Sequence, residues 1–313
     1  MDNSKLVSII IATYNRGHLI SETIESVLEQ SYQFWELIIV DDSSNDNTEN
    51  VVKSYTDKDK RIKYFKRPSY RIKGPNSSRN FGIENSIGDY IVSLDSDDWL
   101  LPDYLMEKVK ILTNNPEIDG VLSKTILVNN NKEIIKREKR TFLTDNVLDD
   151  FISLKISWYM HDILWRKKFL LGKILYNEQL LKMLDRDFHI RRLTENPKLY
   201  LVDEFLALYR IHENSNSLNS RVYVAETRHD AIMQIIEVLS EKKVLTNNNK
   251  FYLFKHQVQN LVILYKSKKC SKLYLQLIKK TFTWNYNYIK WILKLLVGYI
   301  SYKITKRGLR FIQ

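Results

Sequence analysis

The segment YIVSLDSDDWLLPDY, residues 90–104, decides the fold of this chain. A short apolar run leads directly into three aspartates within four positions, and a tryptophan and a proline follow. Like charges repel one another, and a carboxylate is costly to remove from water unless a positive group lies beside it. We therefore expect this acidic tip to be either a solvated loop that caps the next helix or a site that holds a cation.

The first part of the chain alternates between strand-like and helix-like patterns. We expect strands at residues 6–13, 34–42, 61–67 and 89–95, and helices at residues 18–30, 45–55, 74–86 and 102–115. Alternation at this spacing predicts an α/β fold, with a mostly parallel sheet and helices on both faces. Ligands of such sheets bind beyond the carboxyl ends of the strands.

Polar residues lie at the ends of three of the four expected strands or directly after them. They are Thr13, Tyr14 and Asn15 after the first, Asp41 and Asp42 after the second, and Asp95, Ser96, Asp97 and Asp98 after the fourth. Asp95 and Asp97 are two positions apart, so on an extended chain both carboxylates point the same way and can reach one ion. Mg²⁺ and Mn²⁺ prefer such oxygen ligands and complete their shells with water and substrate phosphates. The pair alone is also compatible with an ordinary turn.

Missing motifs exclude several classes of site. The eight glycines never form G-x-G-x-x-G or a P-loop, so a glycine-rich phosphate cradle is not expected. The chain has no H-E-x-x-H motif and no cluster of cysteines and histidines that would bind zinc. The single cysteine, Cys270, excludes an internal disulfide and indicates a reducing compartment.

Three stretches at the strand ends resemble one known family when they are taken together. They are IIIATYN at 9–15, IIVDDSSNDNT at 38–48 and SSRNFGIENSIGDYIVSLDSDD at 77–98. They resemble the family 2 glycosyltransferases of the GT-A fold, which are inverting nucleotide-sugar transferases of polysaccharide assembly. The resemblance covers about residues 6–217. It implies a mostly parallel, Rossmann-like sheet and transfer of a sugar from a nucleoside diphosphate, with UDP favoured.

The resemblance implies that the first two strand ends bind the base of the nucleotide. Tyr14 would stack on the base, and Thr13 and Asn15 would lie beside it. Asp41 would accept a hydrogen bond from the base, and Asp42 would support that loop.

The diphosphate side of the donor follows from the same resemblance. Arg79 would face the nucleotide or its phosphates, and Asp95, Ser96 and Asp97 would form the D-x-D motif that meets the ribose and the diphosphate-bound Mn²⁺ or Mg²⁺. The stretch YRIHENSNS at 209–217 resembles the R-x-H-x-x-S closure of this family. His212 would then touch the diphosphate or complete the metal shell, and a surface histidine is the alternative.

The general base should lie in YNEQLLKMLDRDFHIRRL, residues 176–193, which resembles the acceptor-side segment of the family. Asp185 falls on the catalytic aspartate, and it would take the proton of the acceptor hydroxyl in a single, inverting displacement. Leu184 replaces the acid that commonly precedes this aspartate, so Asp187 remains the alternative base. Both acids could also lie at a solvated helix start, where the helix dipole favours them.

The remaining histidines carry no predicted chemistry. His161 lies in an acceptor-side segment, and we expect it to have a packing role. We expect His18 and His229 to be surface residues.

The C-terminal part of the chain differs from the rest in charge. Residues 242–313 contain sixteen lysines and arginines and no acid, although the whole chain carries a net charge of only +12. We expect a GT-A domain at 1–219 and a basic helical extension at 220–313. Basic, aromatic-rich amphipathic helices are typical of proteins that lie on anionic membranes, although a helical bundle packed on the catalytic domain is the alternative. The aspartates expected at the carboxyl edge of the sheet would repel a polyanion, which argues against a nucleic-acid partner.

The sequence therefore predicts a glycosyltransferase at the cytoplasmic face of a membrane, without a signal peptide or membrane-spanning segment. Its expected acceptor is a lipid-linked or growing cell-surface glycan. The alternative is a non-catalytic membrane scaffold or a nucleotide-sugar-binding protein of polysaccharide assembly, for which Leu184 is the supporting feature. The sequence leaves open which sugar is transferred, to which acceptor, and in what oligomeric state.

Overall fold

The computed structural model describes residues 5–137, 141–211 and 221–265, together with the single helical positions 293, 297 and 300. The chain divides into two compact units, residues 1–215 and 216–313. The predicted boundary after residue 219 falls in the segment 212–220, which is outside the described residues, and it stays a prediction.

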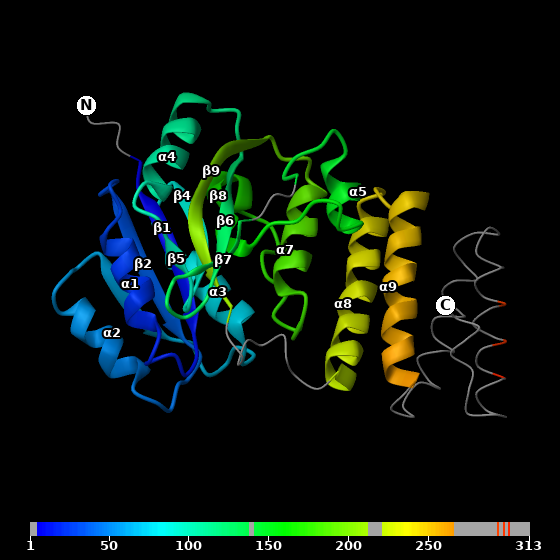
Figure 1. The fold of residues 1–313 in the computed structure, drawn as a ribbon, viewed down its shortest axis with the longest axis horizontal. Helices are drawn as coiled ribbons and strands as arrows, with labels where there is room; N and C mark the ends of the chain where they lie inside the picture. Colours follow the sequence, from blue (N-terminus) through cyan, green and yellow to red (C-terminus); the bar gives the residue numbers. More distant parts are fainter. Residues whose placement is uncertain are drawn as a thin grey trace. The chain divides into compact units, whose positions relative to one another are not determined.

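The first unit is built around one nine-stranded sheet (Figure 1). Its strands are β1 (Val7–Thr13), β2 (Trp35–Asp41), β3 (Ile62–Lys66), β4 (Tyr90–Asp95), β5 (Trp99–Leu100), β6 (Gly120–Val128), β7 (Ile134–Arg137), β8 (Ile163–Arg166) and β9 (Leu199–Arg210). Its helices are α1 (Ile20–Leu28), α2 (Thr48–Thr56), α3 (Pro75–Glu84), α4 (Tyr104–Asn114), α5 (Val147–Ile152), α6 (Lys167–Leu170) and α7 (Leu184–Leu193), with a 3₁₀ turn, η1, at Met160–Asp162. The four predicted strands and four predicted helices are all present, and the predicted α/β class is confirmed.

The strand order explains why the polar strand ends meet. The sheet runs β3-β2-β1-β4-β8-β6-β9-β5, with β7 paired to β6, and β1 to β4 are mutually parallel where they pair. Thr13 lies opposite Asp41 in the β1–β2 pair, and Ala12 lies opposite Asp95 in the β1–β4 pair. The three strands therefore end at one level, and their carboxyl-terminal residues share one edge of the sheet.

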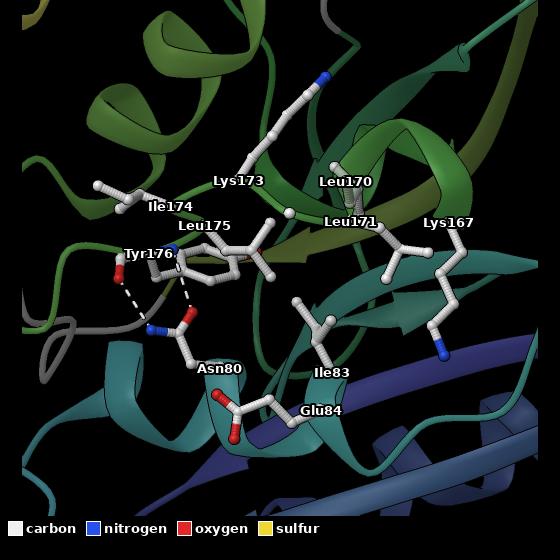
Figure 2. Close-up of a pocket in the computed structure, with 11 residues that line it drawn as sticks. Asn80, Ile83, Glu84, Lys167, Leu170, Leu171, Lys173, Ile174, Leu175 and Tyr176 are labelled. Atoms are coloured by element: carbon white, nitrogen blue, oxygen red, sulfur yellow. Dashed lines mark hydrogen bonds between the residues drawn. The ribbon is translucent and has the colours of Figure 1, made fainter.

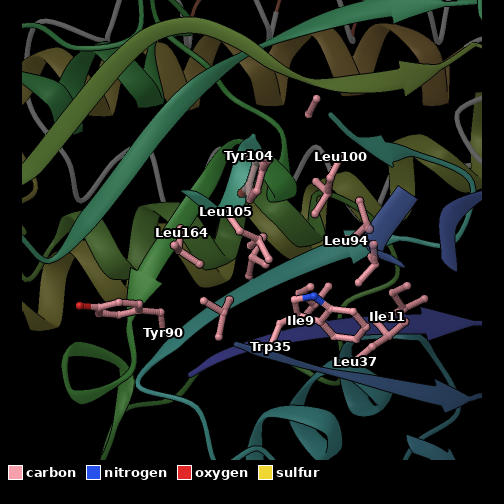
Figure 3. Packing of buried hydrophobic residues seen from close by; sticks show 14 of the residues in the cluster. Ile9, Ile11, Trp35, Leu37, Tyr90, Leu94, Leu100, Tyr104, Leu105 and Leu164 are labelled. Atoms are coloured by element: carbon pink, nitrogen blue, oxygen red, sulfur yellow. The ribbon is translucent and has the colours of Figure 1, made fainter. Parts of the chain in front are cut away.

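The continuous apolar run of β1 is explained by burial on both faces. Ile9 and Ile11 point to the face covered by α1 and α4 and belong to a buried cluster with side chains of β2 and β4 (Figure 3). Ile10 points to the opposite face, because successive strand residues alternate. There it meets Gly82 of α3, at which an added Cβ would lie 2.5 Å from Ile10 Cγ2. The absence of a side chain at residue 82 thus allows α3 to lie close to the sheet.

Two helices of the second unit are described, α8 (Arg221–Glu241) and α9 (Asn247–Tyr265), and they contact each other. The expectation that His229 is a surface residue was wrong. His229 is buried, and its Nδ1 lies 2.7 Å from Oε1 of Gln257, because the paired helices enclose these two polar groups together. His18, in contrast, is exposed as predicted. Most of the basic segment 242–313 lies outside the described residues. Among the helices that can be described, none is both long and apolar enough to cross a membrane.

The close contact of α3 with the sheet gives a prediction. Gly82→Ala should destabilise the protein by about 1–3 kcal/mol, the usual cost of overpacking a filled core. Urea unfolding of the full chain measures this free energy. In an Ile10→Ala background the added methyl group has room, so the same substitution should cost much less. Equal costs in both backgrounds would show that Ile10 is not the obstacle.

Candidate functional site

The loops that follow β1 and β2 are hydrogen-bonded into one surface. The Asp42 N–H donates to the Thr13 carbonyl at 2.9 Å, and the Asn15 N–H donates to Ser44 Oγ at the same distance. Asn15 accepts in return from the Asn45 N–H through Oδ1, at 2.9 Å. Its φ of +52° lies in the left-handed region that asparagine tolerates better than most residues. Thr13 and Asn15 thus connect the loop that follows β1 to the loop that follows β2.

Tyr14 is the exposed aromatic residue of this surface, with 42% of its area accessible. The Lys73 ammonium group lies 4.3 Å from the centroid of its ring. Asp41 is buried, and its two carboxylate oxygens accept hydrogen bonds from the Ser44 N–H at 2.7 Å and from the Tyr64 hydroxyl at 2.8 Å. Asp41 therefore stabilises the loop that follows β2. A nucleotide base that also donates to Asp41 would have to use the carboxylate lone pairs that these two hydrogen bonds leave over.

Asp42 forms a buried ion pair with Arg67. Arg67 Nε donates to Asp42 Oδ1, and both side chains are largely shielded from water. Arg67 also donates through Nη1 to the Pro68 carbonyl at 2.9 Å. This pairing fits the supporting role that was predicted for Asp42.

Arg79 and Asp95 form the central contact of the site. Nη2 of Arg79 donates to Asp95 Oδ1 at 2.6 Å, and the arginine is buried in α3. Burial alone would lower the pKa of Arg79, but the charges of Asp95 and Asp185 raise it above its ordinary value. One third of the Asp95 side chain stays exposed, so its carboxylate still faces the open edge of the sheet.

The other residues of the acidic tip have different surroundings. The Asp97 carboxylate lies 3.6 Å from the Arg16 guanidinium and is 19% exposed, whereas Ser96 is buried. Asp98 is buried and accepts from the Arg210 N–H at 2.9 Å. Burial raises the pKa of Asp98 to about 7, although neighbouring His161 opposes this. Asp98 is therefore an internal group, and Asp95 and Asp97 are the carboxylates that remain accessible.

Among the described residues of the acidic tip, Asp95 and Asp97 are the candidate metal ligands, because their carboxylates are accessible. In the described ranges, no group of three or more His, Cys, Asp or Glu residues could hold a metal ion. Two accessible carboxylates fit a cation such as Mg²⁺ or Mn²⁺, which takes its other ligands from water and phosphate oxygens. The predicted contribution of His212 lies outside the described residues.

Asp185 lies in the first turn of α7, close enough to Arg79, Asp95 and His161 for their charges to act on it. Burial raises its pKa to about 6, Asp95 adds to the rise, and Arg79 and His161 oppose it. A carboxylate with such a pKa is ionised at neutral pH and is a stronger base than an ordinary aspartate. The structure thus brings the predicted base and the D-x-D motif into one electrostatic neighbourhood.

Asp187 has different partners from Asp185. It is buried, and its Oδ2 accepts from Arg191 Nε at 2.8 Å. Burial raises its pKa, and Arg191 and Arg192 oppose the rise. Asp187 therefore belongs to an ion pair within α7.

Sequence reasoning missed the surroundings of His161, for which it expected only a packing role. His161 is buried, its Nδ1 lies 3.3 Å from Asp98 Oδ2, and its ring is stacked on Tyr159. Tyr159 in turn stacks on Tyr209 with 4.4 Å between the ring centroids. Burial would lower the pKa of His161, but Asp98, Asp162 and Asp95 together raise it above its ordinary value. Tyr159 is two residues from His161, but Asp98 and Tyr209 are far from it in the sequence, so no local motif could have identified the whole arrangement.

A cavity of about 400 Å³ lies beside α3, between that helix and residues 167–176 (Figure 2). It is lined by Asn80, Ile83, Glu84, Lys167, Leu170, Leu171, Gly172, Lys173, Ile174, Leu175 and Tyr176. None of the predicted site residues lines it. Tyr176 connects it to the site, because the Tyr176 hydroxyl and Ser93 Oγ of β4 lie 2.8 Å apart.

Comparison with known proteins finds relatives that are described as glycosyltransferases. An uncharacterized glycosyltransferase of Methanocaldococcus jannaschii, MJ1057, is 33% identical over 216 residues, which are 68% of this chain and 73% of that protein. The UDP-Glc:alpha-D-GlcNAc-diphosphoundecaprenol beta-1,3-glucosyltransferase WfgD of Escherichia coli is 39% identical over 132 residues, which are 42% of this chain and 50% of WfgD. The chain thus spans only half the length of the second relative.

Two solved structures share the fold. Residues 1–349 of S. aureus TarS in complex with UDP align with 98% of this chain and 83% of that one, at a TM-score of 0.59 and 17% identity. The mannosyltransferase PcManGT of Pyrobaculum calidifontis, in complex with GDP-Man and Mn²⁺, aligns with 98% of this chain and 89% of its own, at a TM-score of 0.56 and 16% identity. These neighbours confirm the predicted GT-A architecture. Residues 8–196 match the sequence model described as "Glycosyl transferase family 2", and the chain belongs to that family.

Proposed function

We propose that this protein transfers a sugar from a nucleoside-diphosphate sugar, UDP being the favoured nucleotide, to a lipid-linked or growing cell-surface glycan. The observation that carries the proposal is the convergence of Asp95, Arg79 and Asp185 at the carboxyl edge of the sheet. Arg79 donates a hydrogen bond to Asp95 and is close enough to Asp185 for the two charges to interact. The residues assigned to the sugar donor and the proposed general base therefore lie near one another. Single displacement at the anomeric carbon would invert its configuration.

The donor would bind along the edge of β1, β2 and β4. Tyr14 offers an exposed ring for the base, on a surface that Asp41 and Asn15 hold in place. WfgD is named for a UDP-Glc donor and TarS was solved with UDP, which supports UDP. PcManGT was solved with GDP-Man, so GDP is the competing nucleotide to test.

A Mn²⁺ or Mg²⁺ ion would be held by Asp95 and Asp97, with His212 as a proposed additional ligand. When bound, the cation would stabilise the departing diphosphate as a Lewis acid. Arg79 keeps the Asp95 carboxylate at the end of β4, and the Arg16 guanidinium lies 3.6 Å from the Asp97 carboxylate in the loop that follows. The Mn²⁺ in the PcManGT complex supports a divalent ion.

Asp185 would accept the proton of the acceptor hydroxyl. Its pKa of about 6 leaves it ionised at neutral pH. Asp187 is the weaker candidate because Arg191 occupies one of its oxygens. A binding-only scaffold would have no need for a partly buried carboxylate with a raised pKa at this place, so catalysis is favoured.

The acceptor would reach the enzyme at a membrane surface. WfgD is named for a diphosphoundecaprenol-linked acceptor, which supports a lipid-linked glycan. We propose that the basic segment 242–313 makes peripheral contact with anionic lipid on the cytoplasmic side. The lysines of that segment, without a single acid among them, are the supporting observation.

The donor site can be tested with Asp97→Ala. Calorimetric titration of the wild type with UDP and GDP, with and without Mn²⁺, should show binding of UDP that Mn²⁺ strengthens. Asp97→Ala should lose this enhancement, by about tenfold or more, because one of two accessible carboxylates is gone. Asp57→Ala, which removes an exposed acid at the end of α2, is the matched control and should bind as the wild type does. No nucleotide binding by the folded wild type would overturn the proposal.

Asp185→Asn separates binding from chemistry. The variant should bind UDP as the wild type does, because the carboxylate is not a donor ligand in this proposal. Its turnover, measured as UDP release from a UDP-sugar, should fall by about 10²–10⁴-fold, the usual contribution of a general base. Turnover within twofold of the wild type would assign the base to another residue.

The stability of the same variant should depend on pH. The folded-state pKa of Asp185, about 6, is above the ordinary value of 3.8, so the stability that its neutral form contributes is lost as pH rises through 6. Asparagine cannot ionise, so Asp185→Asn should gain stability relative to the wild type between about pH 4 and pH 7. Urea unfolding in the presence of EDTA measures this difference. A difference that is constant over this range would show that Asp185 titrates normally.

A further inference from the structure

We propose that Glu178 is a positioning residue, which fixes the segment carrying Asp185 against the helix carrying Arg79. The inference rests on the proposed function, in which Asp185 is the base. Glu178 lies between α6 and α7 in sequence, and it makes its contacts with α3 and the loop before it.

The Glu178 carboxylate accepts three hydrogen bonds. Its Oε2 accepts from Ser77 Oγ at 2.8 Å, and its Oε1 accepts from Asn80 Nδ2 at 2.9 Å. Arg71 Nη1 donates to the same Oε1 at 3.2 Å. Only a quarter of the Glu178 side chain is exposed, so these bonds are poorly replaced by water.

The residues before Glu178 are bound by the same face of α3. Asn76 Nδ2 donates to the Asn177 carbonyl at 2.7 Å. Asn80 accepts from the Tyr176 N–H at 3.0 Å and donates to the Tyr176 carbonyl at 2.9 Å, a pairing visible in Figure 2. Three consecutive residues of the acceptor-side segment are thus attached to one helix, and Glu178 is the only charged residue among them.

This attachment reaches both halves of the candidate site. Arg79 lies on α3 next to Asn80 and holds Asp95. Tyr176 is stacked on Phe188 of α7, with 4.4 Å between the ring centroids and 13° between the planes. Phe188 is one turn from Asp185 on α7. The helix of the donor side is therefore connected through Tyr176 to the helix that carries the base.

Arg71 supplies the positive charge for Glu178 and connects it to Arg67, the partner of Asp42. Its carbonyl accepts from Arg67 Nη1 at 2.5 Å, and Arg67 pairs with Asp42. Arg71 also binds Glu84 through Nη2, at the end of α3. About half of the Glu84 side chain is exposed, so Glu84 offers a matched control: it is a carboxylate on the same guanidinium.

Loss of Glu178 should make the position of Asp185 less well defined without reducing the affinity for UDP. A misplacement of about 1 Å can cost on the order of 10²-fold in rate, even when the change is distant from the chemistry. None of the contacts described above for Tyr14, Asp41 and Asp97 involves Glu178, so UDP should bind as before. The expected signature is a fall in kcat with the KM for the donor unchanged.

The test compares Glu178→Ala, Glu178→Gln and Glu84→Ala in the full chain. Hydrogen exchange by mass spectrometry should rise in residues 176–187 for Glu178→Ala, with the strands β1 and β4 unchanged. UDP release from UDP-glucose, UDP-galactose and UDP-N-acetylglucosamine to water should fall by about tenfold or more at equal UDP affinity. Glu178→Gln should recover part of the loss, since its amide oxygen can still accept from Asn80.

Glu84→Ala decides between positioning and simple loss of a charge beside Arg71. The proposal predicts that it behaves as the wild type in exchange at 176–187 and in turnover. Equal effects of Glu84→Ala and Glu178→Ala, or no change in exchange for either, would overturn it. The exchange measurement decides even when donor hydrolysis is too slow to follow. A wild type that binds no UDP would instead contradict the proposed function.

Discussion

The contact between Arg79 and Asp95 is the interaction on which the rest of the site depends. Asp95 ends a buried strand, and Asp185 approaches the same place with a raised pKa. Two carboxylates in one partly buried place repel each other unless a cation lies between them. Arg79 is that cation, because its guanidinium stays charged at every accessible pH. Its position on α3, close to the sheet beside Gly82, connects the packing of the core with the electrostatics of the site.

The same rule applies to three other acids at this edge, each of which has a basic partner. Asp42 pairs with Arg67, Asp97 lies near Arg16, and Asp98 faces His161. These pairs differ in exposure, and that difference separates the groups that hold the fold from those that can meet a ligand. Buried pairs contribute little net stability but are costly to break, so they fix geometry. The partly exposed carboxylates of Asp95 and Asp97 remain for a cation and a diphosphate.

Much of this arrangement could be predicted from the sequence. Four strands and four helices up to residue 115 follow from the periodicity of apolar residues, whereas the short strand β5 was not predicted. The shared edge of Thr13, Asp41 and Asp95 follows from parallel pairing. The choice between Asp185 and Asp187 could not be made in this way. Residues two apart on a helix point in directions about 200° apart, so these two aspartates cannot both point to the same place. Which of them points to Asp95 and Arg79 depends on how the helix packs, and the sequence does not show this. The partners of His161 and Glu178 are also invisible to sequence patterns, because they are up to about a hundred residues away along the chain.

The central claim is that one edge of the sheet binds a nucleotide sugar between a D-x-D motif and an aspartate base. A crystal structure of the protein with UDP and Mn²⁺, phased to show the anomalous signal of manganese, tests it most directly. The account predicts a manganese peak between the diphosphate and the carboxylate of Asp95 or Asp97. The uracil ring should lie against Tyr14, and the Asp185 carboxylate should face the end of the diphosphate. UDP bound away from this edge, or manganese bound without contact to either aspartate, would contradict it.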